Sequence, residues 1–192
     1  MVSNCTGVIL AGGKSVRMGE DKALLVYNGK TFIQSIGEIL AQLCTDVFIV
    51  AEKKKEYEFL HIPVEEDVIK NIGPLGGIHS ALTYATTEFC FIVSCDVPFI
   101  TKELIGYICN FPSSSAIRIP AFNARFHPLC GVYAKKCLPV IEEQIKQNNY
   151  RVQNIFHHIP TAIIPITNAL PFFTPQLLQN INSKTDYKEI LK

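Results

Sequence analysis

Near its N-terminus the chain reads Gly7-Val-Ile-Leu-Ala-Gly-Gly-Lys-Ser-Val-Arg-Met-Gly-Glu-Asp-Lys22, a short apolar run followed by a loop rich in glycine and charge. The apolar run predicts a buried strand. The Gly12-Gly13 pair lets the backbone of the loop approach an anion closely. Lys14, Arg17 and Lys22 bring positive charges that match a polyphosphate. A solvated, basic turn between a strand and a helix would account for the same composition.

Outward from this stretch, apolar runs typical of buried strands alternate with segments of helical periodicity. Thr31 and Thr101 are the predicted N-caps of two of the helices. This alternation is typical of an α/β fold, with right-handed crossovers and helices on both faces of the sheet. We expect a single Rossmann-like domain over residues 1–192, mostly parallel with one antiparallel strand. The predicted strands are 7–11, 24–27, 46–51, 62–65, 89–94, 116–119, 130–133 and 161–166, and the predicted helices include 32–44, 53–60, 78–85 and 101–110.

The composition limits the classes of protein to which the chain can belong. Of its 192 residues, 48% are hydrophobic and 18% are charged, a balance that excludes a disordered chain. The formal net charge of +1 lacks the basic surplus of a nucleic-acid binder or a polybasic membrane-surface protein. No apolar run approaches the ~18 residues of a membrane helix, and the N-terminus predicts no signal peptide. The seven cysteines contain no Cys-x-x-Cys pair, so we expect free thiols and a cytoplasmic protein.

Three features are predicted to meet at one edge of the sheet, because ligands of such sheets bind outside the carboxyl ends of the strands. These are the first glycine-rich loop, a second one at residues 71–77, and Asp96, which directly follows the strand predicted at 89–94. Mg²⁺ uses one or two carboxylates together with substrate phosphates, so one aspartate beside a phosphate-binding loop suffices to hold it. The alternative is that Asp96 caps a helix, but Pro98 intervenes and Thr101 is the better cap.

Two well-known phosphate-binding motifs do not explain the first loop. The dinucleotide fingerprint G-x-G-x-x-G is absent, since the glycines fall at positions 12, 13 and 19. The P-loop pattern would need its first glycine at Val8, which lies inside the predicted strand.

The stretch from Leu10 to Lys22 matches L-A-G-G-x-S-x-R-M-G-x-D-K, and it resembles the signature of the molybdenum cofactor guanylyltransferase family of nucleotidyltransferases. Further segments extend this resemblance over nearly the whole chain. They are Asp67 with Gly73-Pro-Leu-Gly-Gly77, Ser94-Cys-Asp-Val-Pro-Phe99, His127-Pro-Leu-Cys-Gly-Val-Tyr133, Tyr150-Arg-Val152 and Asn180-Ile-Asn-Ser-Lys-Thr-Asp186.

The resemblance implies a fold of the nucleotide-diphospho-sugar transferase type and a nucleotidyl transfer reaction. GTP would donate GMP to the phosphate of molybdenum-bound molybdopterin, and pyrophosphate would leave. It implies Arg17, Lys22 and Asp96 as catalytic residues, and Asp96 as the ligand of Mg²⁺. The implied nucleotide-binding residues are Leu10, Ala11, Gly12, Gly13, Lys22, Asp67, Gly73 and Asp96, and the implied acceptor-binding residues are Arg151, Asn180 and Asn182.

Alternative functions remain open at this point. A CTP-dependent molybdopterin cytidylyltransferase or a sugar-phosphate nucleotidyltransferase would use the same chemistry, and a non-catalytic nucleotide-binding protein would keep only the fold. Two departures from the family pattern are Glu52-Lys53, where GTP users often have Asn-Arg, and Ser183-Lys184, where the family has Thr-Pro. We expect a monomer or small homo-oligomer that contacts the assembly proteins of molybdoenzymes transiently.

Overall fold

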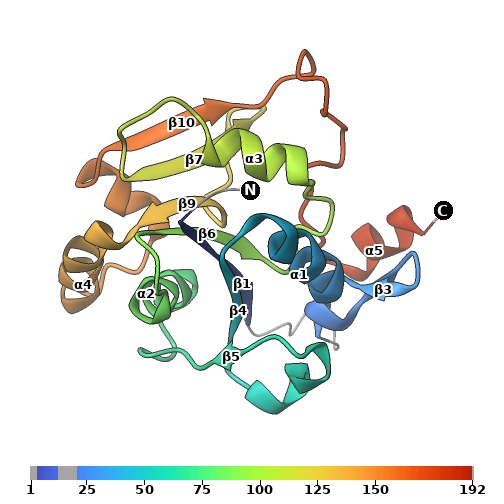
Figure 1. Ribbon diagram of the computed structural model, residues 1–192, viewed down its shortest axis with the longest axis horizontal. Coiled ribbons are helices and arrows are strands. Elements are labelled where there is room, and N and C mark those ends of the chain that lie inside the picture. Colours follow the sequence, from blue (N-terminus) through green and yellow to red (C-terminus); the bar gives the residue numbers. More distant parts are fainter. Residues whose placement is uncertain (1–3, 13–20, 192) are drawn as a thin grey trace.

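A computed structural model describes residues 4–12 and 21–191 of the chain (Figure 1). Its centre is a mixed eight-stranded sheet in the order β10-β7-β9-β6-β1-β4-β5, with β8 paired to β7, and a separate hairpin of β2 and β3. The strands are β1 (Cys5–Ala11), β2 (Val26–Tyr27), β3 (Lys30–Thr31), β4 (Asp46–Ala51), β5 (Val64–Glu65), β6 (Phe89–Ser94), β7 (Ile117–Phe122), β8 (Arg125–Phe126), β9 (Cys130–Ala134) and β10 (Thr161–Pro165). The α-helices are α1 (Phe32–Leu43), α2 (Pro74–Tyr84), α3 (Lys102–Cys109), α4 (Leu138–Lys146) and α5 (Lys184–Ile190), and the 3-10 helices are η1 (Lys22–Leu24), η2 (Lys54–Leu60), η3 (Lys135–Cys137) and η4 (Val152–His157).

The sheet is mostly parallel, as the sequence predicts. β1 pairs in parallel with β4 and β6, β4 with β5, and β7 with β10. β9 runs antiparallel to both of its neighbours, β6 and β7, and the two-residue β8 runs antiparallel to β7. The direction of β9 matters for function, because its beginning, and not its end, lies at the edge where β1, β4 and β6 finish.

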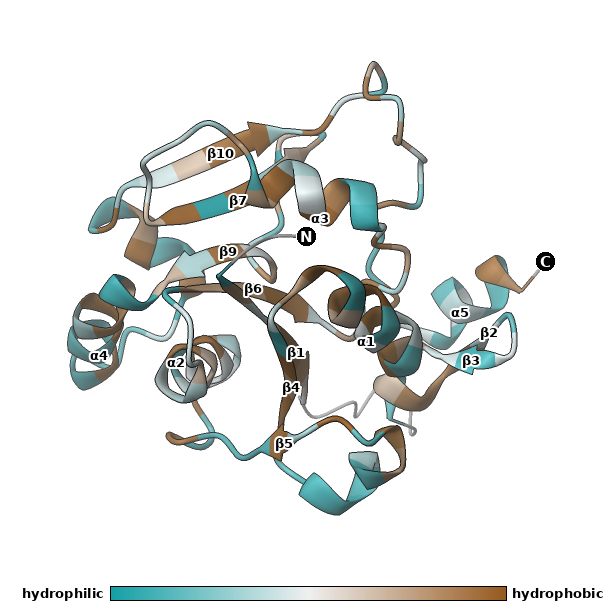
Figure 2. Ribbon diagram, in the orientation of Figure 1, coloured by the Kyte–Doolittle hydropathy of each residue, from teal (hydrophilic) through white to brown (hydrophobic). Residues whose placement is uncertain are grey.

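Helices cover both faces of the sheet, which confirms the predicted α/β architecture (Figure 1). Alternate residues of each central strand enter two separate cores. Ile9 and Ile49 pack on the side of α1 and α3, whereas Val8 and Val50 pack on the side of α2 and α4. All seven residues of β1 are buried, so the strand reads as a continuous apolar run. Figure 2 shows the result, with hydrophobic strands and hydrophilic outer helix faces.

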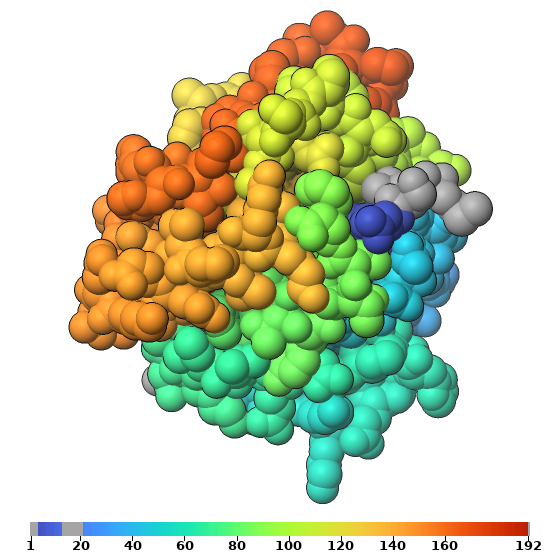
Figure 3. Space-filling model, turned by 60° about the vertical axis from the view of Figure 1, so that its left-hand side comes forward, coloured from blue at the N-terminus to red at the C-terminus, as the bar shows by residue number. Residues whose placement is uncertain are grey.

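The α2–α4 face brings together segments that are far apart in the sequence. Figure 3 shows the orange region of α4 lying against the green region of α2, with η2 in teal below them. Nε2 of His79, on α2, lies 3.6 Å from Oε1 of Glu142, on α4. All seven cysteines are free thiols, as expected. Within residues 4–12 and 21–191, no helix has the length and apolar character needed to cross a membrane.

Local sequence signals place most helix starts correctly. The hydroxyl of Thr31 accepts from the Gln34 N–H, and that of Thr101 accepts from the Leu104 N–H, so both predicted N-caps are confirmed. The start predicted for α2 is wrong by four residues. The helix begins at Pro74, because proline suits the first helical position, which needs no N–H donor.

The strand predicted at 24–27 is also wrong in part. Residues 22–24 form η1, and only Val26 and Tyr27 pair with β3. The side chain of Asp21 caps η1 by accepting the Ala23 N–H at 3.0 Å, which favours a helical turn here. Asn28 and Gly29 both have positive φ, as a two-residue type I′ hairpin turn requires.

Candidate active site

The carboxyl ends of β1, β4 and β6 form the edge at which the predicted site residues meet. Leu10, Val50 and Ile92 all point to the α2 side of the sheet. Because side chains alternate along a strand, Gly12, Glu52 and Ser94 continue this face just where the strands end. These three residues line a cavity of about 440 Å³ between the sheet and the N-terminus of α2. We call it the α2-side cavity.

Four of the predicted nucleotide-binding residues line this cavity, namely Leu10, Gly12, Asp67 and Gly73. Ala11 does not line it, because its side chain is 2% exposed and packs into the core on the side of α1. Any contact between Ala11 and a ligand would therefore go through its backbone. Gly13 and Arg17 lie outside the described residues.

The loop before α2 is shaped by two glycines. Gly73, the N-cap of α2, has φ 69° and ψ −154°, a conformation that residues with a Cβ rarely adopt. A Cβ on Gly76 would lie 2.8 Å from Cγ1 of Ile72 and 2.9 Å from the backbone oxygen of Ile69. The N–H of Gly76 donates to the Gly73 carbonyl at 3.0 Å. Gly76 therefore serves the packing of loop 69–73 against α2, and its amide is already used within the protein.

Asp67 lies half-buried in the wall of the α2-side cavity. Burial raises the pKa of its carboxyl, and the negative charge of nearby Glu52 acts in the same direction. The sheet register explains why the two acids are close. Val50 pairs with Glu65. Glu52 and Asp67 each follow two positions later, so they lie side by side. The cavity thus offers two carboxylate acceptors near the entrance of α2.

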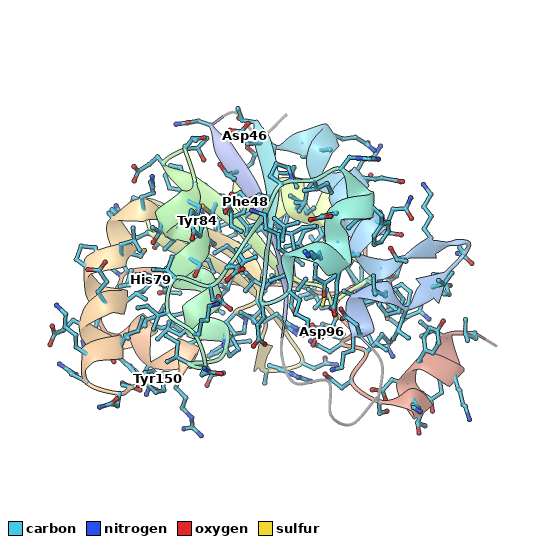
Figure 4. All side chains as sticks on the ribbon, turned by 90° about the horizontal axis from the view of Figure 1, so that it is seen from below. Asp46, Phe48, His79, Tyr84, Asp96 and Tyr150 are labelled. Carbon is cyan, nitrogen blue, oxygen red and sulfur yellow. The ribbon has the colours of Figure 1, made fainter. Side chains whose placement is uncertain are left out.

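Asp96 lies at the same edge, and the C-terminal segment packs against it. The Asn180 side-chain amide donates to Oδ1 of Asp96 at 3.1 Å, and the Ile181 N–H donates to the Asp96 carbonyl at 2.8 Å. Nζ of Lys22 donates to Oδ1 of Asn182 at 2.9 Å. Direct contacts therefore join four predicted site residues in two pairs, Lys22 with Asn182 and Asp96 with Asn180. Figure 4 shows Asp96 at the end of the sheet opposite Asp46, which begins β4.

The donor set around Asp96 suits a metal ion that arrives with phosphate. Oδ1 accepts from Asn180, while Oδ2 makes no hydrogen bond with the residues at 4–12 and 21–191. In those ranges no group of three or more His, Cys, Asp or Glu side chains is arranged to hold a metal by itself. Mg²⁺ typically takes one or two carboxylates and completes its shell with waters and substrate phosphates. One half-buried carboxylate at the site fits such an ion.

The C-terminal element keeps its cap despite its departure from the family pattern. Ser183 is the N-cap of α5, its hydroxyl accepts the Asp186 N–H, and Oδ2 of Asp186 accepts the N–H groups of Asn182 and Ser183 at 2.8 Å each. Serine replaces threonine in this capping box without loss of either bond. These bonds to backbone N–H groups lower the pKa of Asp186. The segment that carries Asn180 and Asn182 is thus held at both ends.

Comparison with known proteins agrees with this arrangement. The profile of the MobA-like NTP transferase domain matches residues 7–161. The chain belongs to the MobA-like NTP transferases. It is similar to a probable molybdenum cofactor guanylyltransferase of Clostridium perfringens (strain SM101), with 32% identity over 191 residues, 97% of this chain and 96% of that protein. A protein of the same description from Aquifex aeolicus is 35% identical over 187 residues, 97% of this chain and 90% of the other.

The fold of this MobA-like transferase is shared with a solved structure. The crystal structure of molybdopterin-guanine dinucleotide biosynthesis protein A from Archaeoglobus fulgidus has a TM-score of 0.81 and 23% identity, and the match covers 96% of each chain. The chain is a nucleotidyltransferase of the nucleotide-diphospho-sugar transferase fold. The matched profile ends at residue 161, so Asn180 and Asn182 lie beyond it.

One predicted site residue of the MobA-like transferase is not joined to the others. Arg151 is exposed and precedes η4, and no hydrogen bond or ion pair between described residues links it to Asp96 or Asn180. Figure 4 shows Tyr150, the preceding residue, toward the same end of the sheet as Asp96 but on the side of α4. Its part in acceptor binding stays a prediction.

Sequence reasoning missed several polar residues of this edge. Asp21 caps η1 and accepts a hydrogen bond from the hydroxyl of Tyr57, which fixes the chain just before Lys22. Glu52 was noted only as a departure from the family pattern and Ser94 only as part of a family segment, yet both line the α2-side cavity. The signal that could have found both is the one used for Asp96, a polar residue at the carboxyl end of a buried strand. In the sequence, Asp21 could be noticed only because it belongs to the stretch that matches the family signature.

Proposed function

We propose that residues 1–192 form one nucleotidyltransferase domain that transfers GMP from GTP to the phosphate of molybdenum-bound molybdopterin and releases pyrophosphate. The observation that carries the proposal is the pair of contacts Lys22–Asn182 and Asn180–Asp96. They bring a cation, a carboxylate and the C-terminal amides to the edge where the nucleotide would lie. The names of the full-length relatives from Clostridium and Aquifex supply the donor base and the acceptor.

In this reaction the protein needs to position the two substrates and to neutralise their negative charge. The acceptor phosphate is ionised at pH 7 and can attack the α-phosphorus in line, so no general base is needed. Mg²⁺ held by Asp96 would polarise the α-phosphate and offset the charge that develops on it. The ammonium of Lys22 would bind the triphosphate, and Arg17, in the loop of the family signature, would share this task.

The α2-side cavity would hold the nucleoside. Asp67 and Glu52 present carboxylates, which accept hydrogen bonds from ribose hydroxyls or from N–H groups of a base. Guanine offers two adjacent donors on one edge, N1–H and the N2 amino group, and both can reach one carboxylate. The two acids at residues 52 and 67 therefore favour GTP among the four nucleotides. The sequence alone gave Glu52 as a departure from GTP users, but from the cavity wall its carboxylate could accept hydrogen bonds from guanine.

The expected setting of the enzyme is the cytoplasm, with GTP and molybdopterin as substrates and molybdoenzyme assembly proteins as transient partners. The alternatives are a CTP-dependent cytidylyltransferase and a sugar-phosphate nucleotidyltransferase. They share the roles of Lys22 and Asp96 and differ in the base and in the acceptor, so ligand binding separates them.

The test is a thermal shift experiment with four nucleotides. GTP with Mg²⁺ is expected to raise the Tm more than ATP, CTP or UTP does. A ligand at a hundred times its Kd stabilises the native state by about 2.7 kcal/mol, or about 5–10 °C for a domain of this size. Release of pyrophosphate from GTP with molybdopterin checks turnover. A larger shift with CTP would contradict the guanylyltransferase function and favour the cytidylyltransferase.

A further inference from the structure

A second cavity, of about 530 Å³, lies on the other side of the segment that leads into β9. Leu129 of that segment lines the α2-side cavity, whereas His127 lines the second one. Its other polar walls include Arg125, Asn180 and Asn182. We call it the C-terminal cavity, because residues 175–186 form one of its sides. The family resemblance includes His127 in the segment from His127 to Tyr133 but implies no role for it, and it does not extend to Arg125.

The fold brings these two residues to the active edge in a way that local sequence does not reveal. The β7–β8 hairpin turns through Asn123 and Ala124, both with positive φ, and it pairs Phe122 with Arg125. The His127 N–H then donates to the Pro120 carbonyl at 3.0 Å. Because β9 runs against β6, the residues before β9 lie at the carboxyl end of β6, beside Asp96.

His127 is buried, and yet its ring is not used by the protein around it. The residue is 8% exposed, and neither ring nitrogen makes a hydrogen bond with a residue in the described ranges. Burial, and then the positive charge of Arg125, lower the pKa of His127. A neutral imidazole keeps one N–H donor. Because the ring lines the C-terminal cavity and has no hydrogen-bond partner among the described residues, its N–H is free to donate to a ligand there.

The charges around the cavity favour an anion. The guanidinium of Arg125 is exposed and near enough to His127 to affect its titration. Among the described residues that line the cavity, Asp186 is the one acid, and its Oδ2 already accepts the N–H groups of Asn182 and Ser183 at the start of α5. A planar guanidinium that can donate two parallel hydrogen bonds is well suited to a phosphate.

The cavity is also tied to the reacting centre. Asn180 lines it and donates to Asp96, and Asn182 lines it and accepts from Lys22. A phosphate in this cavity would therefore lie next to Lys22, which would bind the triphosphate, and next to Asp96, which would hold Mg²⁺. The α2-side cavity, where the nucleoside would lie, is on the opposite side of Leu129.

We propose that Arg125 and His127 bind the phosphate monoester of the acceptor in the C-terminal cavity and so determine which acceptor is used. The proposal rests on the proposed nucleotidyl transfer, since it assigns the acceptor half of that site. Arg125 supplies the charge and the two parallel donors. His127 supplies an N–H from a fixed, buried ring, which selects for the position of the phosphate.

The kinetic test compares Arg125→Gln with wild type and with a matched control. Arg125 is exposed, so the variant is expected to fold. Its KM for molybdopterin should rise by roughly ten- to hundredfold, with the KM for GTP unchanged. The control is Lys136→Gln, which removes one exposed positive charge from η3, beyond the far end of β9. The control should leave both KM values unchanged. Equal acceptor KM values in Arg125→Gln and wild type would overturn the proposal.

A second measurement does not depend on turnover. Inorganic phosphate is added to the wild-type protein without GTP, and the imidazole signals of the five histidines are followed by NMR across pH. The signal lost in His127→Gln identifies His127. Phosphate should raise the pKa of His127, because an anion stabilises the imidazolium, and Arg125→Gln should weaken the effect at least tenfold in phosphate concentration. If the pKa of His127 is the same with and without phosphate, the proposal is overturned. If GTP and molybdopterin give no pyrophosphate but phosphate raises the pKa of His127, the proposed function fails, while a phosphate site at Arg125 and His127 stands.

Discussion

Gly76 offers a sharp test of how the loop before α2 shapes the α2-side cavity. In Gly76→Ala, the new Cβ would meet the Ile69 backbone oxygen at 2.9 Å and Cγ1 of Ile72 at 2.8 Å. A side chain can turn away, but a backbone carbonyl moves only if loop 69–73 moves. Overpacking of this kind costs about 1–3 kcal/mol, and the higher helix propensity of alanine returns up to about 1 kcal/mol. We expect a net loss of about 1–2 kcal/mol.

The matched control is Gly106→Ala, in α3. A Cβ there would meet nothing within 4 Å, so only the gain in helix propensity remains. That variant should be more stable by about 0.5–1 kcal/mol. Urea unfolding measures both free energies. Because loop 69–73 lines the α2-side cavity, Gly76→Ala should also raise the KM for GTP, and Gly106→Ala should not. A Gly76→Ala protein as stable as wild type, with an unchanged KM for GTP, would refute the reasoning.

Three further predictions concern charged groups at the active edge. Asp96→Asn should keep the fold and lose most turnover at saturating Mg²⁺, because it removes the carboxylate that suits the ion. The control Asp46→Asn, at the opposite edge of the sheet, should keep full activity. Normal turnover of Asp96→Asn would exclude the metal role. Lys22→Ala should weaken GTP binding by roughly ten- to hundredfold and guanosine binding hardly at all, as measured by calorimetry, and equal losses for both would contradict a phosphate contact. Because burial raises the pKa of Asp67, the affinity of the wild-type protein for guanosine should fall on acidification, beginning at a higher pH than an exposed aspartate would give. Asp67→Asn should lose this pH dependence. Identical pH profiles for the two proteins would argue against an ionised Asp67 in binding.

Much of the fold could be predicted because its central strands are buried on both faces. Residues 46–51 and 89–94 read as continuous apolar runs, and β4 and β6 have these same bounds. The caps at Thr31 and Thr101 are local hydrogen bonds, so a local pattern identifies them. Short elements were harder. β2 and β3 have two residues each, too few for any periodicity to show.

In the candidate site too, some residues could be predicted from local sequence and others could not. Asp96 could be found because a carboxylate follows an apolar strand directly. The contact between Asn180 and Asp96 joins residues 84 positions apart, and no local pattern contains it. Only the family resemblance pointed to Asn180. Arg125 was missed, and His127 was noted only as part of a family segment. Their place depends on the direction of β9, which is set by pairing with β6 and β7 and not by the sequence around them.

The bond between Lys22 and Asn182 has a consequence for the order of folding. The two residues are 160 positions apart. Closing a flexible loop of that length costs about 4–5 kcal/mol in chain entropy, far more than one hydrogen bond of about 0.5–1.5 kcal/mol returns. The bond can therefore form only after the sheet has brought both ends of the chain to one edge. A folding chain therefore completes the candidate site only when its final segment packs against the assembled sheet.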